Sequence, residues 1–201
     1  MEIVIASHNL GKIREFREIL NKILGLDVDS LLAYPNYVAP KEEGNTLVEN
    51  ATLKAVHAAK ALNKVVIADD SGLFVSALQG APGVHSAYYA GEQANDRDNR
   101  KKLLEALAGK QGMQRSAYFE CVLVMASPTE TLKITTGRVE GMIAEEEKGR
   151  HGFGYDPLFI KHDYDKTFAE LAEDVKNRIS HRRKALDAMI PSLEGLVARS
   201  K

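Results

Sequence analysis

Two adjacent carboxylates, Asp69 and Asp70, follow the apolar residues 65–68 and precede Ser71 and Gly72. The apolar run predicts a buried strand that ends at the aspartates, and ligands of open α/β sheets bind at such a strand edge. Side chains alternate along a strand, so we expect Asp70 to face a substrate and Asp69 to orient the loop or hold a metal-bound water. Adjacent carboxylates repel, and a bound cation relieves the repulsion. The pair favours acid–base chemistry beside a metal over a turn in which aspartate caps backbone N–H groups.

Two glutamates, Glu42 and Glu43, lie in a loop expected at residues 34–45, within reach of the same sheet edge. Mg²⁺ prefers one or two carboxylates, with waters and substrate phosphates as its other ligands. Asp70 with Glu42 satisfies that number, and a solvated glutamate pair is the alternative. The six histidines show no zincin-type spacing, so we expect no zinc site.

A polar turn at residues 7–12 separates an apolar strand from a helical pattern. The free N–H groups and positive dipole end of a helix N-terminus attract anions. Serine, asparagine and lysine side chains add donors, and Gly11 lets a phosphate approach the backbone. The turn is not a Walker A loop, because it lacks the leading glycine and has Ile13 where Ser or Thr would hold magnesium. The alternative is an N-cap at Asn9 with a solvated Lys12.

Asn50, Lys54 and His57 share one face of a predicted helix, because they are spaced i, i+4 and i+7. Lys54, among apolar neighbours, could donate to a phosphate in a cleft; a solvated helix face is the alternative. Glu49 is explained by a capping box with Thr46 rather than by catalysis.

A basic and aromatic set lies near the C-terminus, in residues 153–156 and at Lys176, His181 and Arg182. Phe153 or Tyr155 could stack on a base. Lysine, arginine and charged histidine only donate hydrogen bonds, which suits an acceptor-rich base edge such as that of a 6-oxo purine. The alternative is a basic helix face at residues 176–184 that binds nothing, or binds RNA weakly.

Composition excludes several classes of protein. The formal net charge of −1 over 201 residues is unlike that of a nucleic-acid-coating protein. The single cysteine, Cys121, forms no intramolecular disulfide and suits a reducing compartment. The apolar start is too short for a signal peptide, and no run approaches the ~18 apolar residues of a membrane span. We expect a cytoplasmic protein that binds neither nucleic acid nor membrane.

The elements that position these residues form an α/β pattern. Ile13, Phe16, Leu20 and Ile23 or Leu24 share one face of the first helix. Strands are expected at residues 2–6, 26–33, 65–68, 116–126, 131–140 and 158–160, the fourth and fifth as a hairpin. Further helices are expected at residues 46–62, 95–107 and 180–190, with another turn after Pro191. The pattern predicts a single domain over residues 1–201, possibly in two lobes around a groove.

Taken together, the motifs resemble the inosine triphosphate pyrophosphatase (Ham1-like) family, in its bacterial form. The matches follow the family's order along nearly the whole chain. They are residues 7–12, 49–51 with 54–55, 68–72, 80–83, 152–157, and Lys176 with residues 180–182.

This resemblance implies a mixed, strongly bent sheet with flanking helices, two lobes around a nucleotide-binding cleft, a homodimer and Mg²⁺. The implied reaction hydrolyses ITP, dITP or XTP to the monophosphate and pyrophosphate. Asp70 would be the proton acceptor for water attacking the α-phosphorus, and would hold Mg²⁺ with Glu42. The residues implied to bind the triphosphate are Ser7, His8, Asn9, Leu10, Gly11, Lys12 and Lys54. Those implied to bind the nucleotide and its base are Ser71, Phe153, Gly154, Tyr155, Asp156, Lys176, His181 and Arg182.

Two other functions stay open. A Maf-like nucleotide pyrophosphatase has a related architecture and acts on pyrimidines, but its N-terminal loop typically carries Ser and Arg where this chain has Asn9 and Lys12. A nucleotide-sensing or RNA-binding module without turnover is the second alternative, although the acidic pair would repel a nucleic-acid backbone.

Overall fold

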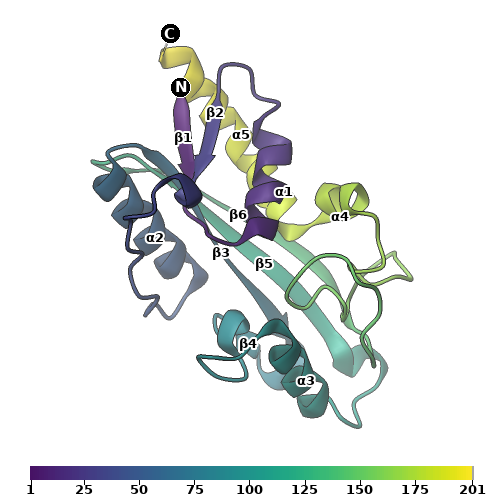
Figure 1. Cartoon of the computed structure of the whole chain (residues 1–201). Coiled ribbons are helices and arrows are strands. Elements are labelled where there is room, and N and C mark those ends of the chain that lie inside the picture. The colour runs from purple at the N-terminus through teal and green to yellow at the C-terminus, as the bar shows by residue number, and fades with distance from the viewer. Residues whose placement is uncertain (201) are drawn as a thin grey trace. The chain divides into compact units, whose positions relative to one another are not determined.

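The structure is a computed structural model that describes residues 1–200, with helices and strands interspersed along the chain (Figure 1). The α-helices are α1 (Leu10–Leu20), α2 (Leu47–Leu62), α3 (Asp96–Ala106), α4 (Glu173–Ile179) and α5 (His181–Arg199). The strands are β1 (Glu2–Ile5), β2 (Asp27–Ser30), β3 (Val65–Val75), β4 (Pro82–Gly83), β5 (Ser116–Ala126), β6 (Thr131–Ile143) and β7 (Phe159–Lys161). The predicted α/β class is confirmed.

The chain divides into two compact units, and β3, β5 and β6 each contribute one part to either unit. Unit 1 comprises Met1–Asp70, Cys121–Thr136 and the segment from Lys184 onward, and unit 2 comprises Ser71–Glu120 and Gly137–Arg183. In unit 1, β1 pairs in parallel with β2 and β3. In unit 2, β4 pairs antiparallel with β3, and β7 pairs antiparallel with β6. The strand pairing is therefore mixed, as the family resemblance implied.

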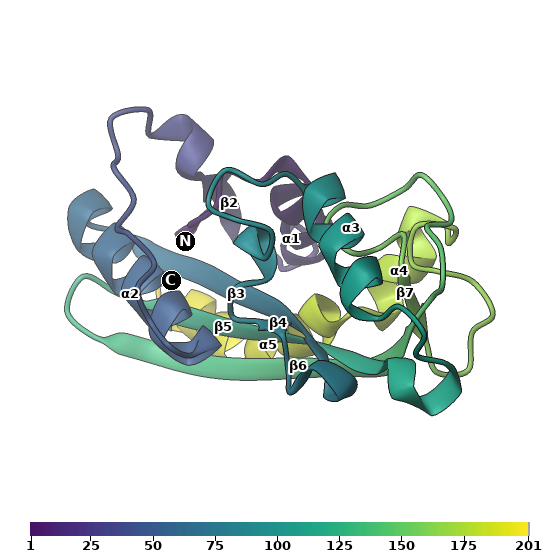
Figure 2. The same ribbon diagram turned by 90° about the horizontal axis from the view of Figure 1, so that it is seen from below.

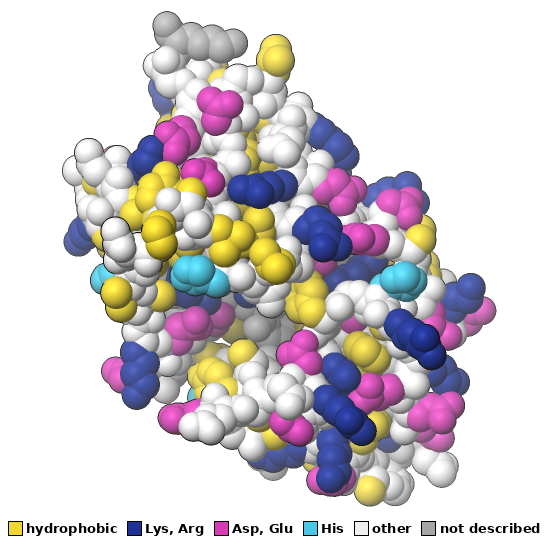
Figure 3. All heavy atoms as spheres, in the orientation of Figure 1, with side chains coloured by type: hydrophobic (Ala, Val, Ile, Leu, Met, Phe, Trp, Pro, Cys, Tyr) yellow, Lys and Arg dark blue, Asp and Glu magenta, His cyan; other side chains and the backbone are white. Residues whose placement is uncertain are grey.

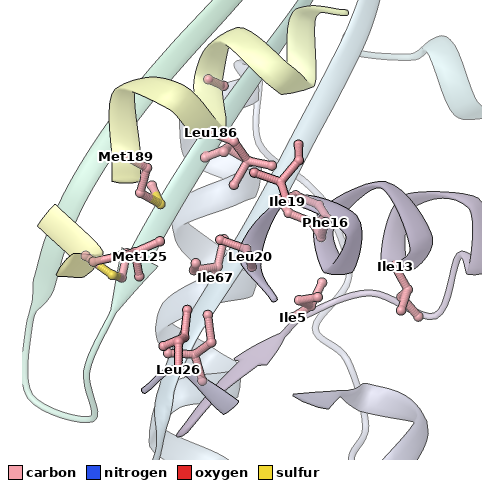
Figure 4. Close-up of a cluster of buried hydrophobic side chains, with 14 of the residues drawn as sticks. Ile5, Ile13, Phe16, Ile19, Leu20, Leu26, Ile67, Met125, Leu186 and Met189 are labelled. Carbon is pink, nitrogen blue, oxygen red and sulfur yellow. The ribbon is translucent and has the colours of Figure 1, made fainter. Parts of the chain in front are cut away.

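The apolar core of unit 1 lies between its strands and helices α1 and α5 (Figure 4). Ile13, Phe16 and Leu20 of α1 are buried, as their helical spacing predicted. Other members are Ile5, Leu26, Ile67, Met125, Leu186 and Met189. The helix ends at Leu20, so Leu24, expected on the same face, lies beyond it and is 89 % exposed. This core fixes β1 and α1, and with them the polar turn between the two.

Helix α2 has the predicted start and end. Thr46 Oγ1 caps it by accepting a hydrogen bond from the Glu49 backbone N at 3.1 Å. Glu49 Oε2 in turn accepts from the Asn45 backbone N at 2.7 Å. The helix buries its alanines at Ala51, Ala55, Ala58 and Ala59. Glu49 therefore stabilises the helix start, although it bonds Asn45 rather than the Thr46 backbone N that the predicted capping box requires.

Strand β3 contradicts the prediction that this strand ends at Asp69 and Asp70, because it runs unbroken from Val65 to Val75. At Gly72 a Cβ atom would lie 2.5 Å from the backbone oxygen of Gly83 in β4. The glycine therefore permits close strand pairing rather than a turn. The two aspartates lie inside a strand, and the alternative of an aspartate-capped turn is wrong as well.

Unit 2 has its own apolar core, in which α3 packs with strand and loop residues. Its members include Leu73, Val75, Leu103, Leu107, Phe119, Val139, Phe159 and Phe168. Helix α3 lies within residues 95–107, where the sequence predicted a helix.

Strands β5 and β6 are neighbours, as the predicted hairpin requires. Their connecting turn is closed by Ser127 N, which donates to Glu130 O at 2.8 Å.

The C-terminal region differs from the prediction in two ways. Helix α5 passes through Pro191 and continues to Arg199. Proline usually breaks or kinks a helix, but Leu193 beyond it is fully buried in the core of unit 1, so tertiary packing outweighs the local cost. Residues 176–184 are also not one helix, because Ser180, in extended backbone, separates α4 from α5.

The surface carries both signs of charge. Lys and Arg side chains are interspersed with Asp and Glu over the face shown in Figure 3, in agreement with the net charge of −1. A charged ligand would therefore have to be bound by a local cluster rather than by a surface of one sign. Within residues 1–200, every helix is too short or too polar to cross a bilayer.

Candidate active site

The turn between β1 and α1 presents the polar residues that the sequence singled out. Ser7 Oγ accepts a hydrogen bond from the Asn9 backbone N at 3.1 Å. Asn9 Oδ1 caps α1 by accepting from the Lys12 backbone N at 3.0 Å, so the predicted N-cap is present. His8, Asn9 and Leu10 are exposed. The start of α1 therefore faces solvent, where an anion can approach its N–H groups.

The Lys12 side chain forms an ion pair instead of being solvated. Its Nζ lies 2.8 Å from Asp69 Oδ2, and the two side chains are 20 % and 2 % exposed. The charge of each partner offsets the cost of burying the other. The contact holds the Lys12 ammonium against β3, next to the turn that begins α1.

Asp70 contacts α2. Its Oδ1 lies 2.9 Å from Lys54 Nζ, and its Oδ2 accepts from Asn50 Nδ2 at 3.4 Å. Asn50 Oδ1 accepts from the Gly44 backbone N at 2.8 Å, which fixes the orientation of the amide. The two aspartates thus have partners on different helices, in agreement with strand alternation. Asn50 and Lys54 reach the same carboxylate from one helix face, as their spacing predicted.

Of the two loop glutamates, Glu42 is the one beside this aspartate. Its Oε2 lies 3.1 Å from Lys54 Nζ, so Lys54 bridges Glu42 and Asp70. Glu43 pairs instead with Lys41 at 3.5 Å and is 72 % exposed. The geometry favours Glu42 over Glu43 as the partner of Asp70.

Burial and charge change the titration of this group of residues. Burial raises the pKa of the Asp70 carboxyl above its usual range, although Lys54 and Lys12 oppose the shift. Burial by itself lowers the pKa of Lys54, but the carboxylates of Asp70, Asp69 and Glu42 outweigh it, and the pKa is raised. Lys54 is therefore cationic at neutral pH. A carboxyl with a raised pKa is a better proton acceptor than an ordinary aspartate, and such groups cluster at functional sites.

A pocket of ≈ 150 Å³ in unit 1 brings most of these groups together. It is lined by Ala6, Ser7, His8, Lys12, Leu31, Tyr37, Ala39, Pro40, Glu42, Lys54 and Asp69. The ammonium groups of Lys12 and Lys54 suit a phosphate, and the carboxylates in the lining are those of Glu42 and Asp69. Asp69 itself lines the pocket. Asp70 does not, but it forms an ion pair with Lys54, which does. The pocket is thus lined by Asp69, whereas the sequence led us to expect Asp70 as the aspartate that faces the substrate.

The carboxylates of Glu42 and Asp70 fit a Mg²⁺ ion. Their oxygens converge on one cation, the Lys54 ammonium, at 3.1 and 2.9 Å. Mg²⁺ is a hard cation that takes one or two carboxylates and completes its shell with phosphate and water. Among residues 1–200, no group of three or more His, Cys, Asp or Glu side chains is arranged to hold a metal. Two carboxylates would leave most of the Mg²⁺ shell to water and phosphate oxygens.

In unit 2, a second set of predicted residues gathers around Phe153. Lys176 Nζ lies 2.6 Å from Asp156 Oδ2, and both side chains are nearly buried. The same oxygen accepts from the Phe153 backbone N at 2.9 Å. The Lys176 ammonium also lies 4.7 Å from the centroid of the Phe153 ring. A side chain at Gly152 would collide with Asp156, so the loop needs glycine there.

Arg182 and His181 extend this set. The Arg182 guanidinium lies 5.7 Å from the Phe153 ring centroid, and its NH2 donates to Ser71 Oγ at 3.4 Å. The His181 ring stacks on Phe119, with centroids 4.6 Å apart and planes at 11°. A buried cluster of hydrogen-bond donors beside an aromatic ring suits a planar ligand whose edge carries acceptors.

Tyr155 packs in the apolar core of unit 2. Its hydroxyl donates to the Ser86 backbone O at 2.9 Å, and burial raises its pKa. Of the two aromatic residues proposed for stacking on a base, Phe153 is the one that is only half-buried. Phe153 is therefore the better candidate.

Two contributions were not predicted from the sequence. Tyr37 Oη lies 2.9 Å from His57 Nδ1 and joins the loop at residues 34–45 to α2. The backbone of Gly154 is held by Asp96 and Arg100 of α3. The helical spacing placed His57 on the face of Lys54, but a partner in an irregular loop leaves no periodic signal in the sequence.

The chain is similar to known proteins over nearly its whole length. A model of the Ham1 family matches residues 3–192. Proteins named dITP/XTP pyrophosphatase from Chlamydia abortus and Bacillus subtilis are each 52 % identical, over 99 % and 96 % of this chain and 97 % of each relative. The solved Ham1 protein of Staphylococcus aureus has a TM-score of 0.84 at 47 % identity, covering 97 % of this chain and 99 % of its own. A solved nucleoside-triphosphatase, or dITP/XTP pyrophosphatase, from Mycobacterium abscessus has a TM-score of 0.75 at 36 % identity, covering 95 % of this chain and 100 % of its own.

Proposed function

Because this chain belongs to the Ham1 family, we propose that it hydrolyses ITP, dITP and XTP to the monophosphate and pyrophosphate. It thereby removes these nucleotides from the nucleotide pool. The observation that carries the chemistry is the bridge from Asp70 through Lys54 to Glu42, beside a pocket that Lys12 also lines. We propose further that residues 1–201 act as one catalytic domain, in the cytoplasm and as a homodimer.

In the proposed mechanism, unit 1 binds the phosphates and carries out the reaction. The turn at residues 7–12 and the ammonium groups of Lys12 and Lys54 bind the triphosphate. Asp70 accepts a proton from the water that attacks the α-phosphorus, and the bond from that phosphorus to the bridging oxygen breaks. Lys12 and Lys54 stabilise the charge on the departing pyrophosphate. Glu42 and Asp70 would hold Mg²⁺, which would neutralise and align the phosphates when bound.

The donor cluster of unit 2 accounts for the choice of base. Lys176, His181 and Arg182 offer donors to a 6-oxo group, which inosine and xanthine carry and adenine does not. A site built to bond one substrate atom can reject analogues that lack it by about 10⁴-fold or more. GTP shares the 6-oxo group, so its rejection depends on the fit around its 2-amino group.

A panel of nucleoside triphosphates tests this proposal against its rivals. With Mg²⁺ present, we expect turnover of ITP, dITP and XTP, with ITP preferred over ATP, dTTP and UTP. Chelation should stop turnover, and added Mg²⁺ should restore it. A preference for dTTP or UTP would favour a Maf-like enzyme, and binding of ITP without turnover would favour a nucleotide-binding module.

A further inference from the structure

The peptide groups of Gly154 are held from outside their own loop. The Gly154 backbone N donates to Asp96 Oδ2 at 2.7 Å, and its backbone O accepts from Arg100 NH1 at 2.9 Å. Asp96 and Arg100 are four residues apart, hence neighbours on one face of α3. Both polar groups of a single residue are thus satisfied by one helix.

Helix α3 is a rigid support for this contact. Asn95 and Asp98 form a complete capping box at its start. The Asn99 side chain accepts from Ala90 N at 2.8 Å and donates to Ala87 O at 3.0 Å. Figure 2 shows α3 lying beside the loops of the C-terminal half of the chain. The side chains that hold Gly154 therefore project from an element that is itself anchored.

Arg100 is also held on its far side. Its Nε lies 3.0 Å from Glu147 Oε2, and the Arg100 side chain is 14 % exposed. A long side chain fixed at both ends loses little further freedom when it binds Gly154. The ion pair with Glu147 therefore limits the positions that Arg100 can take beside Gly154.

The orientation of Gly154 matters because of its neighbour Phe153. Gly154 has a φ of +60°, in the left-handed region that favours glycine. On one side, the Phe153 ring lies beneath the cations of Lys176 and Arg182. On the other side, Tyr155 is anchored in the core through its bond to the Ser86 backbone. A rotation at Gly154 would therefore be taken up mainly by Phe153.

We propose that Asp96 and Arg100 are positioning residues that set base specificity, by fixing the Gly154 backbone and through it the Phe153 ring. Neither side chain needs to touch the substrate. The inference rests on the proposed role of the Phe153 cluster in binding the base. It predicts that weakening the hold lowers discrimination between bases and leaves the phosphate chemistry of unit 1 unchanged.

Two substitutions at one position separate this role from helix stability. Asp96→Ala and Asp96→Asn both remove the negative charge from the first turn of α3, which costs helix stability in either variant. Only asparagine keeps an oxygen that can accept the bond from Gly154 N. We expect Asp96→Ala to lower the ratio of kcat/KM for ITP to that for ATP by roughly tenfold, mainly through KM for ITP. Asp96→Asn should stay near the wild-type ratio.

The same comparison applies to Arg100. Arg100→Met removes the donor to Gly154 O and should lower the ratio as Asp96→Ala does. Glu147→Gln removes the charge paired with Arg100 but leaves that donor, and should lower the ratio less than Arg100→Met does. Lys101→Ala is the surface control, because its side chain is 76 % exposed on the same helix.

Hydrogen exchange measured without nucleotide makes the test independent of the proposed function. The Gly154 amide should exchange about tenfold faster in Asp96→Ala than in Asp96→Asn. Equal exchange and equal specificity in the two variants would overturn the inference. A different result would be that the Gly154 amide exchanges faster in Asp96→Ala while the wild-type chain does not prefer ITP over ATP. That result would contradict the proposed function and would leave the hold on Gly154 intact.

Discussion

Replacing Asp70 by asparagine is expected to lower kcat for ITP by about 10²–10⁴-fold while ITP still binds. Asparagine has almost the same shape but neither accepts the proton nor supplies the negative charge. Lys54 retains Glu42 as a counter-charge at 3.1 Å, so the buried ammonium is not left unpaired. The measurement is steady-state kcat and KM with ITP, together with calorimetric binding of ITP in the presence of Mg²⁺.

Asp29→Asn is the matched control for this variant. Asp29 is a partly exposed aspartate on β2 whose carboxylate lies 3.8 Å from Arg17. Exposed pairs of this kind contribute little, about 0–1 kcal/mol, so turnover should stay close to that of the wild type. Undiminished turnover in Asp70→Asn would remove Asp70 as the proton acceptor. Asp69, which also lines the pocket, would then be the next candidate.

Replacing Lys54 by methionine is expected to lower kcat/KM for ITP by about 10²–10³-fold, because a donor to the departing pyrophosphate is lost. It should also move the acid limb of the pH–rate profile to higher pH. Lys54 lowers the pKa of Asp70, whereas burial and the charge of Glu42 raise it. Without Lys54 the pKa rises further. Because the proton acceptor must be ionised, activity is then lost at a higher pH as the solution is acidified.

The pH dependence of kcat and of kcat/KM at saturating Mg²⁺ checks this result. Lys54→Arg is the control, because arginine keeps a positive charge beside Asp70, and its acid limb should stay near that of the wild type. An acid limb that does not move in Lys54→Met, at a reduced rate, would show that another group than Asp70 controls it.

The sequence predicted an element best where the spacing of its side chains and the conformation of its backbone indicate the same structure. The spacing of Ile13, Phe16 and Leu20 identified α1, and Thr46 with Glu49 identified the start of α2. The predicted end of β3 at Asp69 and Asp70 was wrong, because two charged residues after an apolar run are typical of the end of a buried strand. The strand continues because each aspartate has a lysine partner and because β4 approaches Gly72 closely.

The contacts between distant segments could not be predicted from the sequence. The family resemblance assigned Lys12 and Lys54 to one task, the binding of phosphate. Only the fold brings each of them to a different aspartate. The hold of α3 on Gly154 is likewise invisible in the sequence, because its acceptor and donor meet backbone groups. Backbone groups are the same at every position and leave no mark on residue type.

The fate of the oxygen of the attacking water tests the central claim most directly. ITP is hydrolysed with Mg²⁺ in water enriched in ¹⁸O, and the products are separated and their mass measured. The proposed mechanism predicts IMP and pyrophosphate, with the label in the phosphate of IMP, because water attacks the α-phosphorus. IDP with inorganic phosphate, or label in the pyrophosphate, would contradict it.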